Sequence, residues 1–166
     1  MNEHSFIAKI HRKLPPEVER WKINDTNKIG VADCYYDGPQ HGALFVEYKW
    51  MAALPKRDTT VVRDLGVSPA QARWLKERHT RGVQVAVILG GVDYAVIFPG
   101  DTWEALYTAG ELRTMSGTHD RVVRWIAQHT GAPHGEASVT TRRVPRSSGG
   151  GTVPGAVSRF FNHEVR

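Results

Sequence analysis

Two short runs of the sequence carry residue types suited to chemistry on a phosphate. Glu47-Tyr48-Lys49 ends one apolar run rich in β-branched and aromatic residues, and Asp33 lies in the run before it. Because side chains alternate between the two faces of a strand, Glu47 and Lys49 are expected to share one face. The sequence therefore predicts an acid and an ammonium group presented side by side.

The two runs, residues 29–36 and 43–50, are predicted to form a β-hairpin around a loose loop at 37–42. Pairing about the centre of that loop places Asp33 beside Glu47 or diagonal to it. Two carboxylates so close repel each other unless a cation lies between them. Mg²⁺ is usually bound by one or two carboxylates together with water and substrate phosphate.

Such an ion can lower the pKa of a bound water and polarise a phosphoryl oxygen, while an adjacent lysine steadies the attacking water or the transition state. These are the requirements of phosphodiester hydrolysis. A lone Glu-x-Lys is most often an ordinary solvent-facing strand pair. Here the context favours a metal site, because a second acid lies at pairing distance and Gly30-Val31-Ala32-Asp33 enters its strand from a glycine turn.

Helices must hold these runs in place, and two of them have clear signals. Residues 5–14 carry apolar side chains at helical spacing and stop at the proline pair that begins at Pro15, since proline cannot continue a helix. A Ser-Pro-x-Gln capping box beginning at Ser68 opens a second helix, which Gly82 closes. The two acids and the lysine lie between these two helices in the sequence.

The remaining elements complete the expected fold. Two apolar runs, 83–89 and 92–98, join at a glycine pair at 90–91 and predict two more strands in a tight hairpin. An Asp-x-x-Glu capping box predicts a short helix over 101–110, and 119–130 predicts a final amphipathic helix. The expected fold class is α/β (α+β), with a mixed central sheet of about four strands flanked by helices.

Bulk composition limits the number of domains and the kind of partner. The 166 residues, 40% of them hydrophobic, suffice for one core, so we expect one domain over 1–131. The net charge of +5 favours a negatively charged partner, nucleic acid before an anionic membrane surface. A single cysteine, Cys34, excludes an internal disulfide and a cysteine-based zinc cluster, which fits a reducing compartment.

Residues 132–166 are predicted to form a flexible basic C-terminal tail, because glycine, proline, serine, threonine and arginine dominate there. Five arginines against two glutamates give this segment a net charge of +3. A cationic arm fits contact with phosphates, and a solvated tail that only aids solubility fits equally well.

Membrane association and export are not expected. No apolar run approaches the roughly 20 residues that a spanning helix needs. The start of the chain, Met1-Asn2-Glu3-His4, lacks the basic-then-apolar pattern of a signal peptide. We therefore expect a soluble cytoplasmic protein of a bacterium or a phage-infected cell.

In order and spacing, residues 3–100 resemble the PD-(D/E)XK nuclease superfamily, in the branch of archaeal-type Holliday junction resolvases and virus-type replication-repair nuclease (VRR-NUC) domains. The resemblance rests on an early glutamate, the Gly30–Asp33 turn, Glu47-Tyr48-Lys49 and a helix with a glutamine. It departs at Ala32, where the family usually has proline.

The resemblance implies a restriction-endonuclease-like core and an enzyme of DNA recombination or repair, of a kind that phages also carry. It implies that Asp33, Glu47 and the backbone carbonyl of Tyr48 bind Mg²⁺ or Mn²⁺, with Lys49 as the catalytic lysine. The departure at Ala32 concerns the rigidity of the turn and none of these metal ligands.

Two further residues each have two interpretations. Glu3 shares a helical stripe with inward-facing apolar residues, so it either reaches the cation, as the resemblance implies, or benefits from the positive end of a helix dipole near water. Gln71 either closes the start of its helix as a capping-box residue or lies near the metal as the family's glutamine does.

Other polar residues carry less weight. Cys34 is expected to point to the opposite strand face from Asp33 as a core residue, and the eight histidines show no metal spacing. Basic residues after the second acidic run and on the second helix are either a solvated face or a track for a phosphate backbone. The predicted nucleic-acid-binding set is Lys56, Arg57, Arg63, Arg73 and Lys76.

The site residues and the resemblance together predict a Mg²⁺-dependent endonuclease that hydrolyses DNA phosphodiester bonds. The resemblance to resolvases implies selectivity for branched DNA such as Holliday junctions. A symmetric junction calls for a symmetric homodimer. Two alternatives stay open: a less selective nuclease that nicks or degrades DNA, and a non-catalytic nucleic-acid-binding protein on the same fold.

Overall fold

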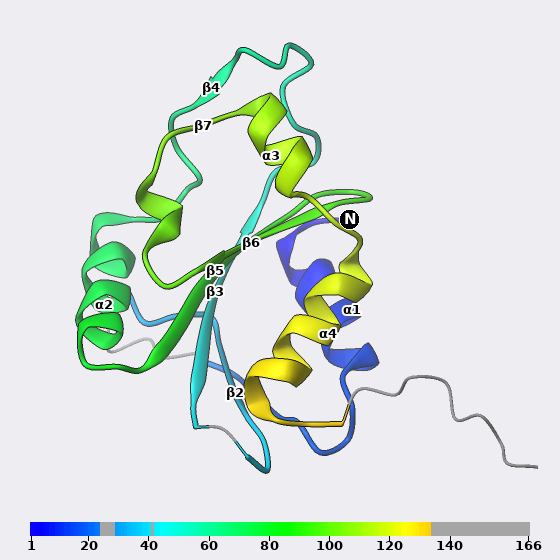
Figure 1. Cartoon of the computed structure of the whole chain (residues 1–166), viewed down its shortest axis with the longest axis vertical. Helices are drawn as coiled ribbons and strands as arrows, with labels where there is room; N and C mark the ends of the chain where they lie inside the picture. The colour runs from blue at the N-terminus through cyan, green and yellow to red at the C-terminus, as the bar shows by residue number, and fades with distance from the viewer. Residues whose placement is uncertain (24–28, 41, 134–166) are drawn as a thin grey trace, which may run out of the picture. The chain divides into compact units, whose positions relative to one another are not determined.

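The computed structural model describes residues 1–23, 29–40 and 42–133, and a five-stranded mixed sheet lies at its centre (Figure 1). The strand order is β1-β2-β3-β5-β6, in which only the β3–β5 pair is parallel. The strands of this sheet are β1 (Glu19–Lys22), β2 (Cys34–Asp37), β3 (Leu44–Trp50), β5 (Gln84–Gly90) and β6 (Ala95–Pro99).

Helices cover both faces of this sheet, and a small two-stranded sheet lies beside it (Figure 1). The helices are α1 (Glu3–Lys13), α2 (Pro69–Thr80), α3 (Ala109–Met115) and α4 (His119–Thr130), with a 3₁₀ turn η1 (Thr102–Glu104). The small sheet pairs β4 (Val61–Val62) with β7 (Tyr107–Thr108). The predicted mixed sheet flanked by helices is therefore confirmed.

The two faces of the sheet bury separate apolar clusters. On one face, Phe6 and Ile10 of α1 and Ile126 of α4 pack with Val46 and Tyr48 of β3. On the other face, α2 and α3 cover the alternate residues of β5 and β6, with Leu75 and Leu112 buried against them. Because the faces alternate along β3, Phe45, Glu47 and Lys49 project on the α2 side.

Two predicted helices begin or end where their caps place them. The Ser68–Gln71 capping box opens α2, and Gly131, with φ of 69°, closes α4. A further capping box that joins Asn2 and Ser5 starts α1 two residues earlier than predicted, so Glu3 lies in its first turn.

The helix predicted over 101–110 is wrong. Asp101 makes no side-chain cap, and residues 102–104 form only the 3₁₀ turn. A competing Thr-x-x-Glu box, in which the Thr108 and Glu111 side chains each bond the other's backbone N–H, starts the helix at Ala109 instead. Gly110, the predicted end of that helix, lies inside α3.

Three strand predictions also needed correction. The sheet has five strands where about four were predicted, and β1 is the strand that the prediction missed. Its residues 19–22 are almost all exposed and lack an apolar pattern. The strand predicted over 29–36 begins only at Cys34. The hairpin turn predicted at 90–91 is longer, closing with a bond from the Gly91 N–H to the Tyr94 carbonyl.

Gly30 explains why residues 29–33 do not extend the strand. Its φ is 89°, and a Cβ there would lie 2.5 Å from the backbone carbonyl carbon of Ala70 at the start of α2. Only glycine fits this close approach without strain. The turn therefore brings the segment carrying Asp33 against the first turn of α2.

The predicted tail lies almost wholly outside the described residues. Ala132, its first residue, is buried with the core cluster next to α4, and residues 134–166 are not described. Within the part of the chain that the structure describes, no helix has both the length and the hydropathy needed to cross a membrane.

Candidate active site

The pairing of β2 with β3 brings the two predicted acids together. The ladder ends at the Cys34–Val46 pair, so Asp33 lies opposite Glu47 one step beyond it. An Asp33 carboxylate oxygen, Oδ2, accepts a hydrogen bond of 2.8 Å from the backbone N–H of Tyr48. This bond fixes the Asp33 side chain over the end of β3.

Glu47 is fully buried, and its two carboxylate oxygens have different surroundings. Oε1 lies 2.7 Å from the Nζ of Lys49 and also accepts a hydrogen bond from the Nε2 of Gln71. Oε2 is buried and has no hydrogen-bond partner within the described residues. A buried polar atom without a partner costs roughly 1–3 kcal/mol of stability. A cation or donor bound at this oxygen would remove that cost.

Burial raises the pKa of Glu47 from 4.5 to about 7. The negative charge of Asp33 raises it next, while the hydrogen bond and charge of Lys49 lower it, and Glu3 adds a further small increase. Lys49 alone therefore does not compensate the buried charge. An additional cation would stabilise the ionised form.

Glu3 lies within electrostatic range of this group. Burial raises the pKa of Glu3 most, the charge of Asp33 raises it further, and the charges of Lys49 and Lys22 lower it. Its place in the first turn of α1 also satisfies the helix-dipole interpretation. Both interpretations of Glu3 are compatible with this position.

Gln71 caps α2 and contacts Glu47 with the same side chain. Its Oε1 accepts the Ser68 backbone N–H at 2.9 Å, which caps α2, while its Nε2 donates to Glu47. The capping box thus holds the amide in place over the buried carboxylate. The capping role is therefore confirmed, and the bond to Glu47 leaves the role near a metal as a prediction.

The donor set fits a hard divalent cation. Within the described ranges, no three His, Cys, Asp or Glu side chains group closely enough to hold a metal alone. Two carboxylates with water and substrate phosphate are nevertheless the usual set for Mg²⁺. The Tyr48 carbonyl points to the same strand edge as the Tyr48 N–H, toward Asp33, beyond the end of the β2–β3 ladder.

The opposite face of β3 is fixed by a hydrogen-bonded chain that no sequence signal indicated. The Tyr48 hydroxyl lies 2.8 Å from that of Tyr36, which lies 2.8 Å from the Nε2 of His11. Burial, followed by the charges of two basic residues, lowers the pKa of His11 to about 4. Cys34 is buried in the core cluster on this face, as predicted for a core residue.

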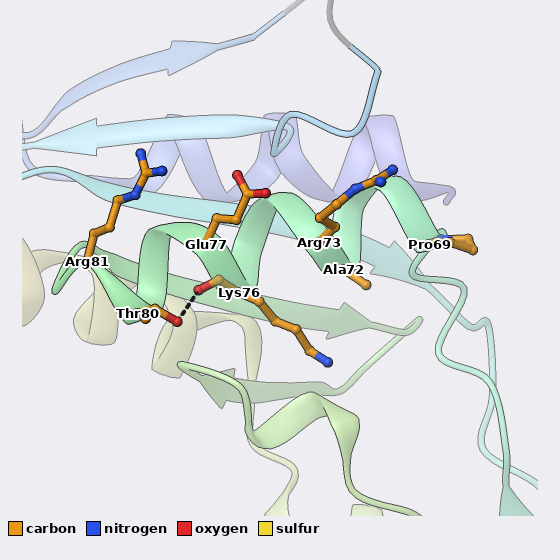
Figure 2. A pocket seen from close by; sticks show the side chains of 7 residues that line it. All are labelled: Pro69, Ala72, Arg73, Lys76, Glu77, Thr80 and Arg81. Atoms are coloured by element: carbon orange, nitrogen blue, oxygen red, sulfur yellow. Dashed lines mark hydrogen bonds between the residues drawn. The ribbon is translucent and has the colours of Figure 1, made fainter.

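The predicted nucleic-acid-binding residues fall in two places. Lys56, Arg57 and Arg63 are exposed in the segment around β4, whereas Arg73 and Lys76 line a shallow groove on α2. Figure 2 shows the side chain of Arg73 extending to one side of the helix and that of Lys76 to the other. Lys76 forms an ion pair with Glu104.

The structure thus brings Glu47, Lys49 and Gln71 into direct contact. It places Asp33 opposite Glu47, bonded to the Tyr48 N–H, and Glu3 within electrostatic range. It does not place Lys56, Arg57 or Arg63 on the same element as the α2 pair.

No family model and no curated protein sequence matches this chain. Among solved structures, it is similar to Hjc, a Holliday junction resolvase from the archaeal hyperthermophile Archaeoglobus fulgidus. The TM-score is 0.45 and the sequence identity 12%, over 75% of this chain and 97% of that chain. At these values the similarity does not by itself assign an activity.

Proposed function

We propose that this chain is a metal-dependent nuclease that hydrolyses phosphodiester bonds in DNA. The observation that carries the proposal is the buried Oε2 of Glu47, which has no hydrogen-bond partner among the described residues, on a side chain that pairs with Lys49 through Oε1 and faces Asp33. A structural ion pair would leave neither this oxygen unsatisfied nor a second acid opposite it.

Asp33, Glu47 and the Tyr48 carbonyl would hold Mg²⁺ or Mn²⁺. When bound, the cation supplies an activated water and neutralises charge on the phosphoryl oxygens. Lys49 is the ammonium group best placed to stabilise the attacking water or the developing charge, because its Nζ already lies within 2.7 Å of Glu47. Gln71 holds the Glu47 carboxylate in orientation.

Within this activity we propose selectivity for branched DNA and a homodimer that matches the two-fold symmetry of a junction. A less selective nickase is the main rival among enzymes. A protein that only binds nucleic acid is disfavoured, because two acids facing a phosphate backbone would weaken binding unless a cation accompanied them.

The proposal is tested with the full chain and four DNA substrates: linear, nicked, flapped and four-way-junction duplexes. Cleavage in Mg²⁺ or Mn²⁺ and none in chelator is expected, with the junction or flap cut fastest. Equal rates on all four substrates would favour the nickase. Absence of cleavage together with no divalent-ion binding by calorimetry, with or without DNA, would favour the binding protein.

A further inference from the structure

A row of aromatic side chains crosses the sheet on the α2 side. The register pairs Trp21 of β1 with Tyr35 of β2, and Tyr35 with Phe45 of β3. The Tyr35 and Phe45 ring centroids are 5.3 Å apart, and those of Phe45 and Trp74 of α2 are 5.1 Å apart. We call Trp21, Tyr35, Phe45 and Trp74 the aromatic row.

The outer end of the aromatic row faces solvent. Trp21 is 70% exposed, whereas the other four tryptophans of the chain are partly buried. Phe45 and Trp74 pack against the α2-side core, so core packing explains the inner end. It does not explain a large exposed aromatic side chain on an edge strand, where such residues invite aggregation.

The aromatic row lies next to the candidate active site. Tyr35 is two residues along β2 from Asp33, and Phe45 two residues along β3 from Glu47, so all four side chains share one face. Two residues of a strand span roughly 7 Å. That spacing is close to the separation of neighbouring phosphates in an extended single strand, so a base on Tyr35 would adjoin a phosphate at Asp33 and Glu47.

The charges around the aromatic row favour a single strand over a duplex. Lys49 lies on the site side, and the Arg78 guanidinium lies 4.5 Å from the Trp74 ring centroid. At the far end, Asp37 accepts a hydrogen bond from the Tyr35 hydroxyl, and Glu19 pairs with Asp37 across the strands. These acids repel the dense charge of a duplex, while an unpaired base gains from stacking.

We propose that Trp21 and Tyr35 form a stacking platform for an unpaired nucleotide of DNA that adjoins the cleaved phosphate. The position of that phosphate rests on the proposed nuclease function; the stacking itself does not. The proposal narrows the substrate to DNA with single-stranded character beside the cut, such as a flap or an opened branch point.

The test measures binding of the full chain in chelator, so that cleavage plays no part. The probes are a fluorescent oligothymidylate of about twelve nucleotides, within the site sizes known for single strands, and a fluorescent duplex of equal length. Trp21→Ala is expected to raise the Kd for the oligothymidylate roughly 5- to 100-fold, the range that loss of one stacking partner gives. Its Kd for the duplex should stay within about twofold, because phosphate contacts dominate duplex binding.

Two matched variants control this measurement. Trp21→Phe keeps a ring and should retain most of the affinity for the oligothymidylate. Leu106→Ala removes another exposed apolar side chain, 66% exposed on the segment before β7, and should change neither Kd. Thermal midpoints of all variants check folding.

The stacking proposal and the nuclease proposal can fail separately. Oligothymidylate affinity unchanged in both Trp21→Ala and Tyr35→Ala, or lowered equally for oligothymidylate and duplex, would overturn the stacking platform even if the wild type cuts DNA. Trp21-dependent binding of oligothymidylate in a protein that does not cut DNA would support the stacking proposal and contradict the nuclease proposal.

Discussion

Glu47 combines a buried position with a charge that the proposed function requires. Its carboxyl group is fully buried, Asp33 faces it, and its pKa is raised to about 7. The fold therefore tolerates the neutral acid better than the carboxylate. Stability favours the neutral form and the proposed function needs the charged one, a conflict that is common in active sites.

A pH series on the metal-free protein tests this conflict. A carboxyl pKa raised on folding contributes stability that is present below pH 4.5 and is lost as pH rises through about 7. Glu47→Gln cannot ionise, so its free energy of unfolding should exceed that of the wild type by an amount that grows across this window, reaching on the order of 1–3 kcal/mol.

The measurement is urea denaturation in chelator for both proteins at each pH. The pKa of His11 is lowered from 6.5 to about 4, so its contribution to stability is lost as pH falls from 6.5 through about 4. His11 is present in both proteins, so this contribution cancels in the difference. A difference that does not change with pH would contradict the raised pKa of Glu47.

At the scale of single residues, the sequence could predict the meeting of Asp33 and Glu47, because strand alternation and the loop centre determine which residues face each other. It could not predict the chain of hydroxyls behind Tyr48. His11, Tyr36 and Tyr48 come from three elements and form no motif, so only the packing of α1 on the sheet joins them.

At the scale of elements, α2 contributes both to the stability of the fold and to the geometry of the candidate site. Its first turn holds Gln71, whose amide caps the helix with one atom and contacts Glu47 with the other. The same turn closes over Gly30 and so positions the segment that leads to Asp33. A local capping motif therefore orients a buried carboxylate.

The two roles of Gln71 separate in a pair of variants. Ser68→Ala and Gln71→Ala each remove one half of the capping box, so each should lower the free energy of unfolding by about 1 kcal/mol. Only Gln71→Ala also removes the donor to Glu47, so only it should lower the cleavage rate, by roughly tenfold, as loss of outer-shell support does. Equal cleavage rates in the two variants would show that Gln71 only caps α2 and does not support the site.

Elements with a local signal were predictable, and those without one were not. The caps at Ser68 and Gly131 indicated α2 and α4 correctly. Two capping boxes competed near residues 101–111, and only the packed structure shows that the second one forms. β1 was missed because hydrogen bonds to β2, rather than burial, define it.

At the scale of the whole molecule, the net charge of +5 does not say which basic side chains are available to bind DNA. On α2, Lys76 is paired with Glu104, whereas Arg73 extends from the other side of the helix (Figure 2). Net charge predicts that the protein binds an anionic partner. Only the structure shows which basic side chains already form an ion pair within the protein.

Salt dependence of DNA binding distinguishes these two cations. Removing one basic side chain that binds a phosphate should reduce the slope of log Kd against log salt by about one. Arg73→Ala is therefore expected to reduce the slope by about one, and Lys76→Ala by less, because Glu104 already neutralises its charge. A wild-type slope in Arg73→Ala, measured by fluorescence anisotropy on a duplex, would remove Arg73 from the binding surface.

The central claim is that Asp33, Glu47 and Lys49 form a metal-dependent phosphodiesterase site. Its most direct test is the cleavage rate of Glu47→Gln beside the wild type in Mg²⁺, because this variant keeps the shape and the contact with Gln71 and should be no less stable at neutral pH. We predict that the wild type cuts DNA and that Glu47→Gln is at least about a thousandfold slower, as for loss of a group that acts in the transition state. Cleavage by Glu47→Gln at the wild-type rate would contradict the claim.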